Sequence, residues 1–253
     1  MHSDQRHRII LELLDKNETI SVVEVAACLD VSEMTVRRDL DVLENRGLLR
    51  RVHGGAVSIR GRSYEPSYVV RSSLHNEAKA RIGQLAATLI ADGDSIALDV
   101  GTTTLEVARA LTDKRGLTVL TPSIHIAEFL SRFPEVRVIV SGGILRPGEM
   151  SLVGGLTERN FAEFFVDKLF LGIGGIDIKA GLTEYNLEDA QVKRAMIGIA
   201  KEVIVVADAS KMGQIAFAAV APLNVVNKIV TDVGIPEAFL TQLQQARVEV
   251  LVA

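Results

Sequence analysis

The chain has 253 residues, a length that favours two domains over a single hydrophobic core. Apolar residues make up 48% and charged residues 24%, the balance of a globular protein, and no uncharged apolar stretch approaches the ~20 residues of a membrane-spanning helix. We therefore expect a cytoplasmic protein that does not bind a membrane. The single cysteine, Cys28, and the five histidines show no metal-binding spacing, so no metal site is expected.

The net charge of −4 argues against a protein that coats nucleic acid indiscriminately. The charge is unevenly distributed, however. Residues 32–62 contain seven arginines and four acidic residues, a local excess of three positive charges. Positive charge is therefore concentrated toward the N-terminus.

Three helices are predicted in the first fifty residues. Apolar side chains recur at helical spacing over 9–14, a second helix begins at Ser21, and a third runs from a cap at Ser32 to about Arg46. Two short helices joined by a turn near 29–32 match the helix-turn-helix plan, whose second helix lies in the major groove of DNA.

The third helix buries Val36, Leu40 and Leu43, so its other faces are free to meet DNA. Arg38 is the first choice for reading a base, because an arginine near the start of such a helix can bind guanine bidentately. The alternative is that Arg37 and Arg38 pair with acidic neighbours on a solvated face. The residues of this helix predicted to contact DNA are Ser32, Met34, Thr35, Arg37 and Arg38.

Residues 48–57 predict a wing, because two short β-prone pieces flank a Gly-Gly turn. Arg50, Arg51 and His53 lie in this wing beside the predicted recognition helix. Cations there would neutralise phosphates and fix the docking without reading the base sequence. A winged helix-turn-helix domain is therefore expected over 1–57.

The segments 31–40 and 51–56 resemble the N-terminal signature of the DeoR family of bacterial regulators. The resemblance continues through the C-terminal part and so covers nearly the whole chain. It implies a winged helix-turn-helix fused to a sugar-phosphate sensor domain.

The larger C-terminal part predicts an α/β domain over 77–253, after a connecting segment at 58–76 that contains Arg60, Arg62 and Pro66. Strand-like runs alternate with helical patterns, which favours a mainly parallel, Rossmann-like sheet with helices on both faces. The expected strands are 95–100, 117–120, 136–140, 168–173, 203–207, 228–231 and 248–252.

Such sheets bind ligands beyond the carboxyl ends of their strands, where small, hydroxylated and charged residues gather in this sequence. Gly101 precedes three threonines that can present N–H groups and hydroxyls to a phosphate at a helix N-terminus, or that simply form a strand-to-helix turn. Lys211 could add positive charge. Glu184 could accept sugar hydroxyls or favour the positive end of the next helix. The predicted effector-binding residues are Asp99, Gly101, Thr102, Thr103, Thr104, Gly142, Gly143, Gly174, Gly175, Glu184, Asp208 and Lys211.

The family resemblance adds to this interpretation, because the DeoR sensor domain is similar to ribose-5-phosphate isomerase and glucosamine-6-phosphate deaminase. It implies that the loop 99–104 holds phosphate, and it extends to 174–177, 181–184 and 208–213. One departure is 122–125, where relatives commonly have Asn after the threonine. Neither a Walker A loop nor GxGxxG is present, so no nucleotide cofactor is expected.

These patterns predict a DNA-binding transcriptional regulator that represses a sugar or polyol catabolic operon until a phosphorylated sugar releases it. Its expected partners are double-stranded operator DNA, the sugar phosphate, and further copies of itself as a dimer or tetramer. The alternative is an isomerase or deaminase-like enzyme carrying a DNA-binding domain, with Asp208 or Glu184 as acid–base groups. A purely structural protein would leave the recognition helix and wing unexplained.

Overall fold

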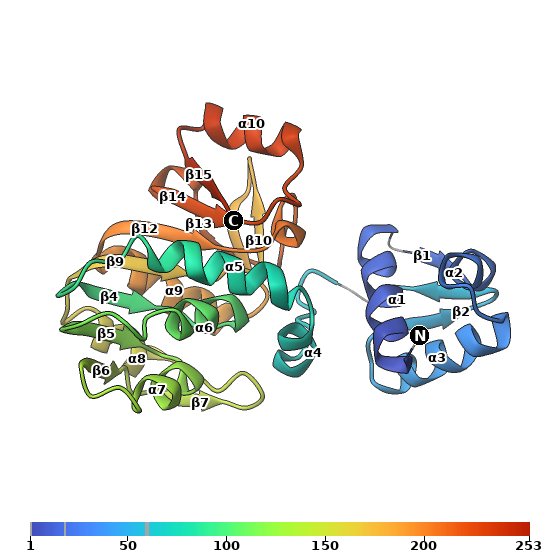
Figure 1. Ribbon diagram of the computed structural model, residues 1–253, viewed down its shortest axis with the longest axis horizontal. Coiled ribbons are helices and arrows are strands. Elements are labelled where there is room, and N and C mark those ends of the chain that lie inside the picture. The colour runs from blue at the N-terminus through green and yellow to red at the C-terminus, as the bar shows by residue number, and fades with distance from the viewer. Residues whose placement is uncertain (1, 18, 59–60) are drawn as a thin grey trace. The chain divides into compact units, whose positions relative to one another are not determined.

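The computed structural model describes residues 2–58 and 61–253 except residue 18, and the chain forms two compact units, Met1–Pro66 and Ser67–Ala253 (Figure 1). The expected connecting segment 58–76 spans this boundary, and its Arg60 lies outside the described residues. Part of the segment is a helix rather than an irregular connection: α4 (Tyr68–Ser73) begins where Ser67 Oγ accepts a hydrogen bond from the N–H of Val70. A helix of six residues is too short to show an apolar repeat.

The N-terminal unit has the predicted three helices and wing. Its order is α1 (Ser3–Asn17), β1 (Thr19–Ser21), α2 (Val22–Leu29), α3 (Glu33–Asn45), β2 (Arg50–Val52) and β3 (Gly55–Val57). The wing strands β2 and β3 pair antiparallel, and β1, which the sequence did not predict, adds to β3 to make a three-stranded sheet. Ser32 caps α3 by accepting a hydrogen bond from the N–H of Thr35, and Gly47 follows the helix with a φ of 67°.

A buried charge network joins α1 to α3, the predicted recognition helix. The Asp39 carboxylate accepts hydrogen bonds from the Arg6 guanidinium, at 2.7 and 2.9 Å, and lies 3.0 Å from His7 Nε2. Burial by itself raises the pKa of Asp39, but the hydrogen bonds and charges of Arg6 and His7 outweigh it and hold this pKa below its ordinary value. The inner side of α3 is therefore fixed by an ionic contact as well as by Val36 and Leu40.

The second unit is built on the predicted parallel sheet. Its seven strands are β4 (Ser95–Leu98), β5 (Leu117–Thr121), β6 (Val136–Val140), β9 (Val166–Leu171), β12 (Ala200–Val206), β14 (Lys228–Thr231) and β15 (Glu249–Val252). All seven expected strands are present; β6 and β14 have the predicted bounds, and the other five are shifted at one or both ends. The strand β12 begins at Ala200 rather than at residue 203, because its polar start pairs with β9 although it lies outside the apolar run.

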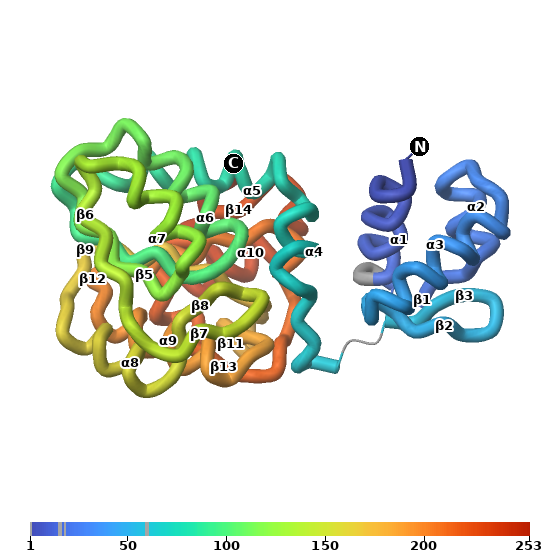
Figure 2. Tube along the Cα trace, turned by 90° about the horizontal axis from the view of Figure 1, so that it is seen from below, coloured from blue at the N-terminus to red at the C-terminus, as the bar shows by residue number. Residues whose placement is uncertain are grey.

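Helices cover both faces of this sheet (Figure 2). One core cluster packs α5 (Asn76–Ala87), α6 (Thr102–Arg109) and α7 (Ile124–Leu130) against the strands. The other packs α8 (Gly155–Phe161), α9 (Leu187–Ile199) and α10 (Glu237–Gln245) on the opposite side. No helix in the described residues is long and apolar enough to cross a membrane.

Short strands supplement the main sheet, and the sequence predicted none of them. β7 (Ile144–Arg146) and β8 (Ser151–Val153) form a hairpin, while β10 (Gly175–Asp177), β11 (Gly181–Glu184) and β13 (Ala218–Ala221) form an antiparallel sheet. Three or four residues are too few to show alternation. Single turns of 3-10 helix lie at Ala209–Lys211 and Leu223–Val225.

The strand order of the main sheet is β15-β14-β12-β9-β4-β5-β6. The chain runs outward from β4 through β5 to β6 and then returns to place β9 on the other side of β4. The order therefore reverses between β4 and β9, and doubly wound sheets bind their ligands at such a reversal, beyond the carboxyl ends of the strands. The predicted loops after β4 and β9 lie at this place.

We predict that Asp39→Asn loosens the N-terminal unit, because Arg6 then lies beside a neutral partner in a mostly buried site. Breaking such a pair costs about 3 kcal/mol. Hydrogen exchange of the full-length chain should therefore become about a hundredfold faster in α3 and remain unchanged in the second unit.

The wild-type contribution of Asp39 should be present above the unfolded-state pKa and lost as the pH falls through the lower folded-state pKa. The control is Glu33→Gln, which breaks only the exposed Glu33–Arg37 pair and should have little effect. Equal exchange in Asp39→Asn and wild type would contradict the role of Asp39.

Candidate functional site

The outer side of α3 presents most of the residues predicted to contact DNA. Met34 is 57% exposed, and Arg37 and Arg38 are exposed as well. Arg37 forms the ion pair expected of a solvated helix face, with Glu33 four residues earlier at 2.9 Å. Arg38 forms no ion pair within the described parts of the chain, so its guanidinium is available to a partner. Ser32 is occupied as the cap, and its Oγ also lies 3.0 Å from Thr35 Oγ1.

The wing is tied to α3 through Arg51. Its guanidinium donates to Asp41 and to the carbonyl of Arg37, and its backbone N–H donates to Glu44 at 2.7 Å. Arg51 is therefore partly buried, whereas Arg50 and His53 are exposed on the same wing. Sequence reasoning gave Arg51 a phosphate contact, and the structure adds that this side chain also holds the wing against the recognition helix.

The loop after β4 leads directly into α6 at the reversal of strand order. Gly101 has a φ of 138°, a conformation that L side chains rarely adopt, and its carbonyl accepts a hydrogen bond from Thr104 Oγ1 at 3.0 Å. Thr102, Thr103 and Thr104 form the first turn of α6 and are buried. The positive end of α6 therefore lies at the reversal of strand order with three threonines in its first turn, of which Thr102 lines a cavity, an arrangement suited to an anion.

A buried ionic cluster adjoins this loop. The Lys193 ammonium of α9 contacts Asp99, lies 3.3 Å from Glu184 Oε2, and donates to the carbonyl of Gly172 at 3.1 Å. Burial raises the pKa of Asp99 to about 6, although the charge of Lys193 opposes the rise. Burial alone would lower the pKa of Lys193, but the negative charges of Asp99, Glu184 and Asp189 outweigh it and raise this pKa. The ammonium is therefore held in its charged form.

The remaining predicted residues near the ionic cluster follow β9 and β12. A Cβ on Gly175 would lie 2.4 Å from the backbone carbonyl oxygen of Gln214, so this position needs glycine, whereas a Cβ on Gly174 would lie 2.8 Å from Glu184 Oε1 and would displace that side chain. Asp208 caps the turn Ala209–Lys211, where nearby Lys211 and the Ser210 hydrogen bond outweigh the effect of burial and lower the Asp208 pKa. Lys211 Nζ lies 5.8 Å from the centre of the Tyr185 ring.

Gly142 and Gly143 stand apart from this group. They follow the edge strand β6, where the carbonyl of Gly142 accepts a hydrogen bond from Thr157 Oγ1 at 2.7 Å. A Cβ on Gly143 would lie 1.9 Å from Thr157 Oγ1. Gly143 therefore has a packing reason against α8, and Gly142 is held to α8 by its backbone carbonyl. Two strands, β4 and β5, separate β6 from β9.

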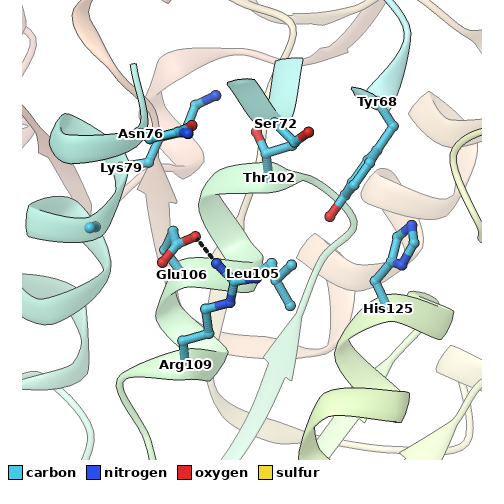
Figure 3. Close-up of a pocket in the computed structure, with 10 residues that line it drawn as sticks. Tyr68, Ser72, Asn76, Lys79, Thr102, Leu105, Glu106, Arg109 and His125 are labelled. Atoms are coloured by element: carbon cyan, nitrogen blue, oxygen red, sulfur yellow. Dashed lines mark hydrogen bonds and ion pairs between the residues drawn. The ribbon is translucent and has the colours of Figure 1, made fainter. Parts of the chain in front are cut away.

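A cavity of about 570 Å³ opens beside the first turn of α6. Figure 3 shows Lys79 and Asn76 of α5 on one side and Tyr68 and His125 on the other, with Thr102 and Ser72 between them. Glu106 and Arg109 pair with each other at 2.7 Å along the wall. The cavity lining is Tyr68, Ser72, Asn76, Lys79, Ala80, Thr102, Leu105, Glu106, Arg109 and His125.

Two buried lysines, Lys79 and Lys193, were absent from the residues predicted to bind the effector. Both occupy the buried side of a helix: Lys79 lies three residues before Ile82, and Lys193 three before Met196. A lysine in an apolar helical stripe is a readable signal, because lysines are almost never buried without a partner. In the described residues, no three potential ligand side chains gather in a group that could hold a metal ion.

Comparison with known families matches both units. Residues 6–62 match the DeoR-like helix-turn-helix domain, and residues 74–233 match the DeoR C terminal sensor domain.

Relatives similar over their full length include the HTH-type transcriptional repressor GlcR of Bacillus subtilis, 36% identical over 100% of this chain and 97% of that protein. The transcriptional repressor AccR of Agrobacterium fabrum is 36% identical over 99% of this chain and 98% of that protein. The glycerol-3-phosphate regulon repressor of Haemophilus influenzae is 33% identical, with 99% and 97% covered.

A partial overlap exists with the solved structure of ribose 5-phosphate isomerase A from Methanocaldococcus jannaschii, at 18% identity, a TM-score of 0.40, and 54% of each chain. The two domain matches and the relatives that are similar over the full length agree with each other. The chain therefore belongs to the DeoR family of transcriptional regulators.

Proposed function

We propose that the protein is a repressor whose α3 and wing bind operator DNA and whose second unit binds a phosphorylated sugar that releases it. The observation that carries the proposal is the first turn of α6, where Gly101 and three buried threonines lie at the reversal of strand order. A helix N-terminus with hydroxyl groups favours a phosphate. The name of the relative that represses a glycerol-3-phosphate regulon supports this class of effector.

The sugar part of the effector would lie toward Asp99 and Glu184. Hydroxyl groups donate well to carboxylates, and Asp99 Oδ1 is buried with no hydrogen-bond partner in the described structure. Lys211, above the Tyr185 ring, would add positive charge on the phosphate side. The ligand would thus be a small phosphate monoester with several hydroxyl groups.

The functional form would be a homo-oligomer, a dimer or tetramer. A repressor with one helix-turn-helix per chain reads a symmetric operator through two copies.

For DNA binding, Arg38→Ala should cost about 1 to 3 kcal/mol and flatten discrimination at one operator position, because a base contact is lost. Arg51→Ala should instead weaken binding to all sequences and reduce the salt slope by about one, because a phosphate contact is lost. Fluorescence anisotropy with operator and mutated operators at several salt concentrations measures both effects.

Two controls separate charge from position. Arg132→Ala removes an exposed arginine of the second unit, where Arg132 pairs with Glu128, and should leave DNA binding unchanged. Asp41→Asn removes the ion-pair partner of Arg51 but keeps its positive charge, so the salt slope should be retained. An unchanged base preference in Arg38→Ala would reject its assignment. If the salt slope of Asp41→Asn were as low as that of Arg51→Ala, Arg51 would act by holding the wing against α3 and not by contacting phosphate.

The second unit should bind sugar phosphates without converting them. Lys193 is held charged between carboxylates and so is a poor base at neutral pH. Incubation with pentose, hexose and amino-sugar phosphates, followed by NMR, should yield neither isomer nor ammonia. Reproducible turnover that disappears in Asp208→Asn or Asp99→Asn would establish the enzyme alternative instead.

Effector and operator should weaken each other's binding by the same factor, typically about 5- to 150-fold, because coupling between two ligands is reciprocal. Lys211→Ala and Thr103→Val should keep DNA affinity without effector and lose release by effector. Calorimetry of the effector with and without operator tests this on both variants.

Lys201→Ala is the matched control, since Lys201 is exposed at the opposite end of β12 from Lys211. It should behave as wild type. Equal effector affinity with and without operator would eliminate release, and tighter effector binding on DNA would indicate a regulator that needs its ligand to bind DNA.

A further inference from the structure

Lys79 differs from the other buried lysine in what surrounds it. It is 5% exposed, it lines the cavity beside α6, and its ammonium donates to the carbonyls of Arg71 at 2.5 Å and Leu74 at 2.7 Å. Lys193 has two carboxylates at ion-pair distance. In the described residues Lys79 has no carboxylate at ion-pair distance, and its hydrogen bonds go to neutral carbonyls. An ammonium has three N–H groups, and two of them serve these carbonyls.

The surroundings of Lys79 lack the negative charge that would stabilise its ammonium, and an anion in the cavity would supply it. Burial lowers the pKa of Lys79 to about 8, and the positive charges of Lys211 and Arg71 lower it further, against the opposing effects of Asp208 and Glu106. Arg71 has its own carboxylate partner in Glu149. A phosphate dianion at this wall of the cavity would stabilise the ammonium and raise its pKa.

The two carbonyls that Lys79 holds belong to the C-terminal end of α4. This helix is also fixed by Arg71, which contacts Glu149 before β8, and by Tyr68, whose ring stacks on His125 with 4.4 Å between centroids. Tyr68 and Ser72 line the cavity from α4. The chain enters the second unit at Ser67, so α4 is the first helix after the DNA-binding unit.

We propose that Lys79 couples effector binding to α4: its third N–H donates to the phosphate of the effector while its other two keep the end of α4 in place. The effector then strengthens the hold on the helix that directly follows the DNA-binding unit. This inference rests on the proposed sugar-phosphate effector and adds the residue that transmits its presence.

The test uses the full-length chain with glycerol 3-phosphate, ribose 5-phosphate and glucose 6-phosphate, and with glycerol, ribose and glucose as controls. Calorimetry at pH 8 in buffers of different ionisation enthalpy gives the affinity and the proton uptake. Hydrogen exchange of residues 68–74 reports on α4. The variants are Lys79→Met and Lys79→Gln, whose amide can still donate to a carbonyl. Lys114→Met is the matched control, because Lys114 also donates to a carbonyl, that of Ile90, but lies outside the cavity lining.

In the wild type and in Lys114→Met, binding of a phosphate monoester at pH 8 should be accompanied by uptake of up to about half a proton, by Lys79. Binding should also slow hydrogen exchange in α4. Both Lys79 variants should bind at least tenfold more weakly, take up no proton, and show no response of α4 to the ligand. The wild-type exchange response needs no variant, so it tests the coupling even if Lys79→Met does not fold.

Unchanged affinity and proton uptake in the folded Lys79 variants would overturn the role of Lys79 with the proposed effector class intact. If the hydrogen-exchange rate of wild-type α4 were the same with and without a bound phosphate monoester, the coupling would be wrong. Binding of the unphosphorylated compounds alone, or of none of the probes, would overturn the proposed effector class and this inference with it.

Discussion

The Lys193 ammonium sets the geometry of the sensor unit. From α9 it reaches Asp99 after β4, Glu184 in β11 and the carbonyl of Gly172 after β9, so groups from four elements, one of them 94 residues away in sequence, meet at one positive charge. All three side chains are buried, and removal of one would leave an uncompensated charge at a cost of about 3 to 5 kcal/mol. The loops on the two sides of the strand-order reversal keep their spacing through this contact.

Such a cluster is a poor source of stability compared with an apolar core of similar volume. Its place between the loops after β4 and β9 fits another role, because it would supply oriented carboxylates to the proposed effector site. The N-terminal unit follows the same pattern: Asp39 holds α1 to the inner side of α3, while Arg38 on the outer side is available to a partner. In both units, buried charges fix a segment that is proposed to bind a ligand: Asp39 fixes α3, and Lys193 fixes the loops after β4 and β9.

The periodic parts of the fold were predictable from the sequence, and the contacts between distant segments were not. Each main-sheet strand carries an apolar run of its own, and the Gly-Gly turn marks the wing, so local reasoning found both. The hairpin β7–β8 and the helix α4 are too short for a repeat. At the candidate site, the loop 99–104 was found by its glycine and threonines. Lys193 was missed because its partner Asp99 lies 94 residues away, and only the folded chain brings the two together. Lys79 was missed although the carbonyls that it binds lie only eight and five residues earlier, because these contacts depend on α4, which was not predicted.

The reversal of strand order also constrains how the sensor unit folds. The strands β4, β5 and β6 follow one another along the chain, but β9 must return to the far side of β4, where Ser95 and Asp167 form a hydrogen bond across 72 residues. Closing so long a loop costs entropy before any pairing compensates for it, so this pairing is expected to form later than the local pairing of β4 with β5. The crevice does not exist before it. The proposed effector would bind only the completed sheet, and by mass action it would shift newly made chains toward the folded state. The concentration of the proposed effector would then determine how much of the protein survives proteolysis as well as how much of it binds DNA.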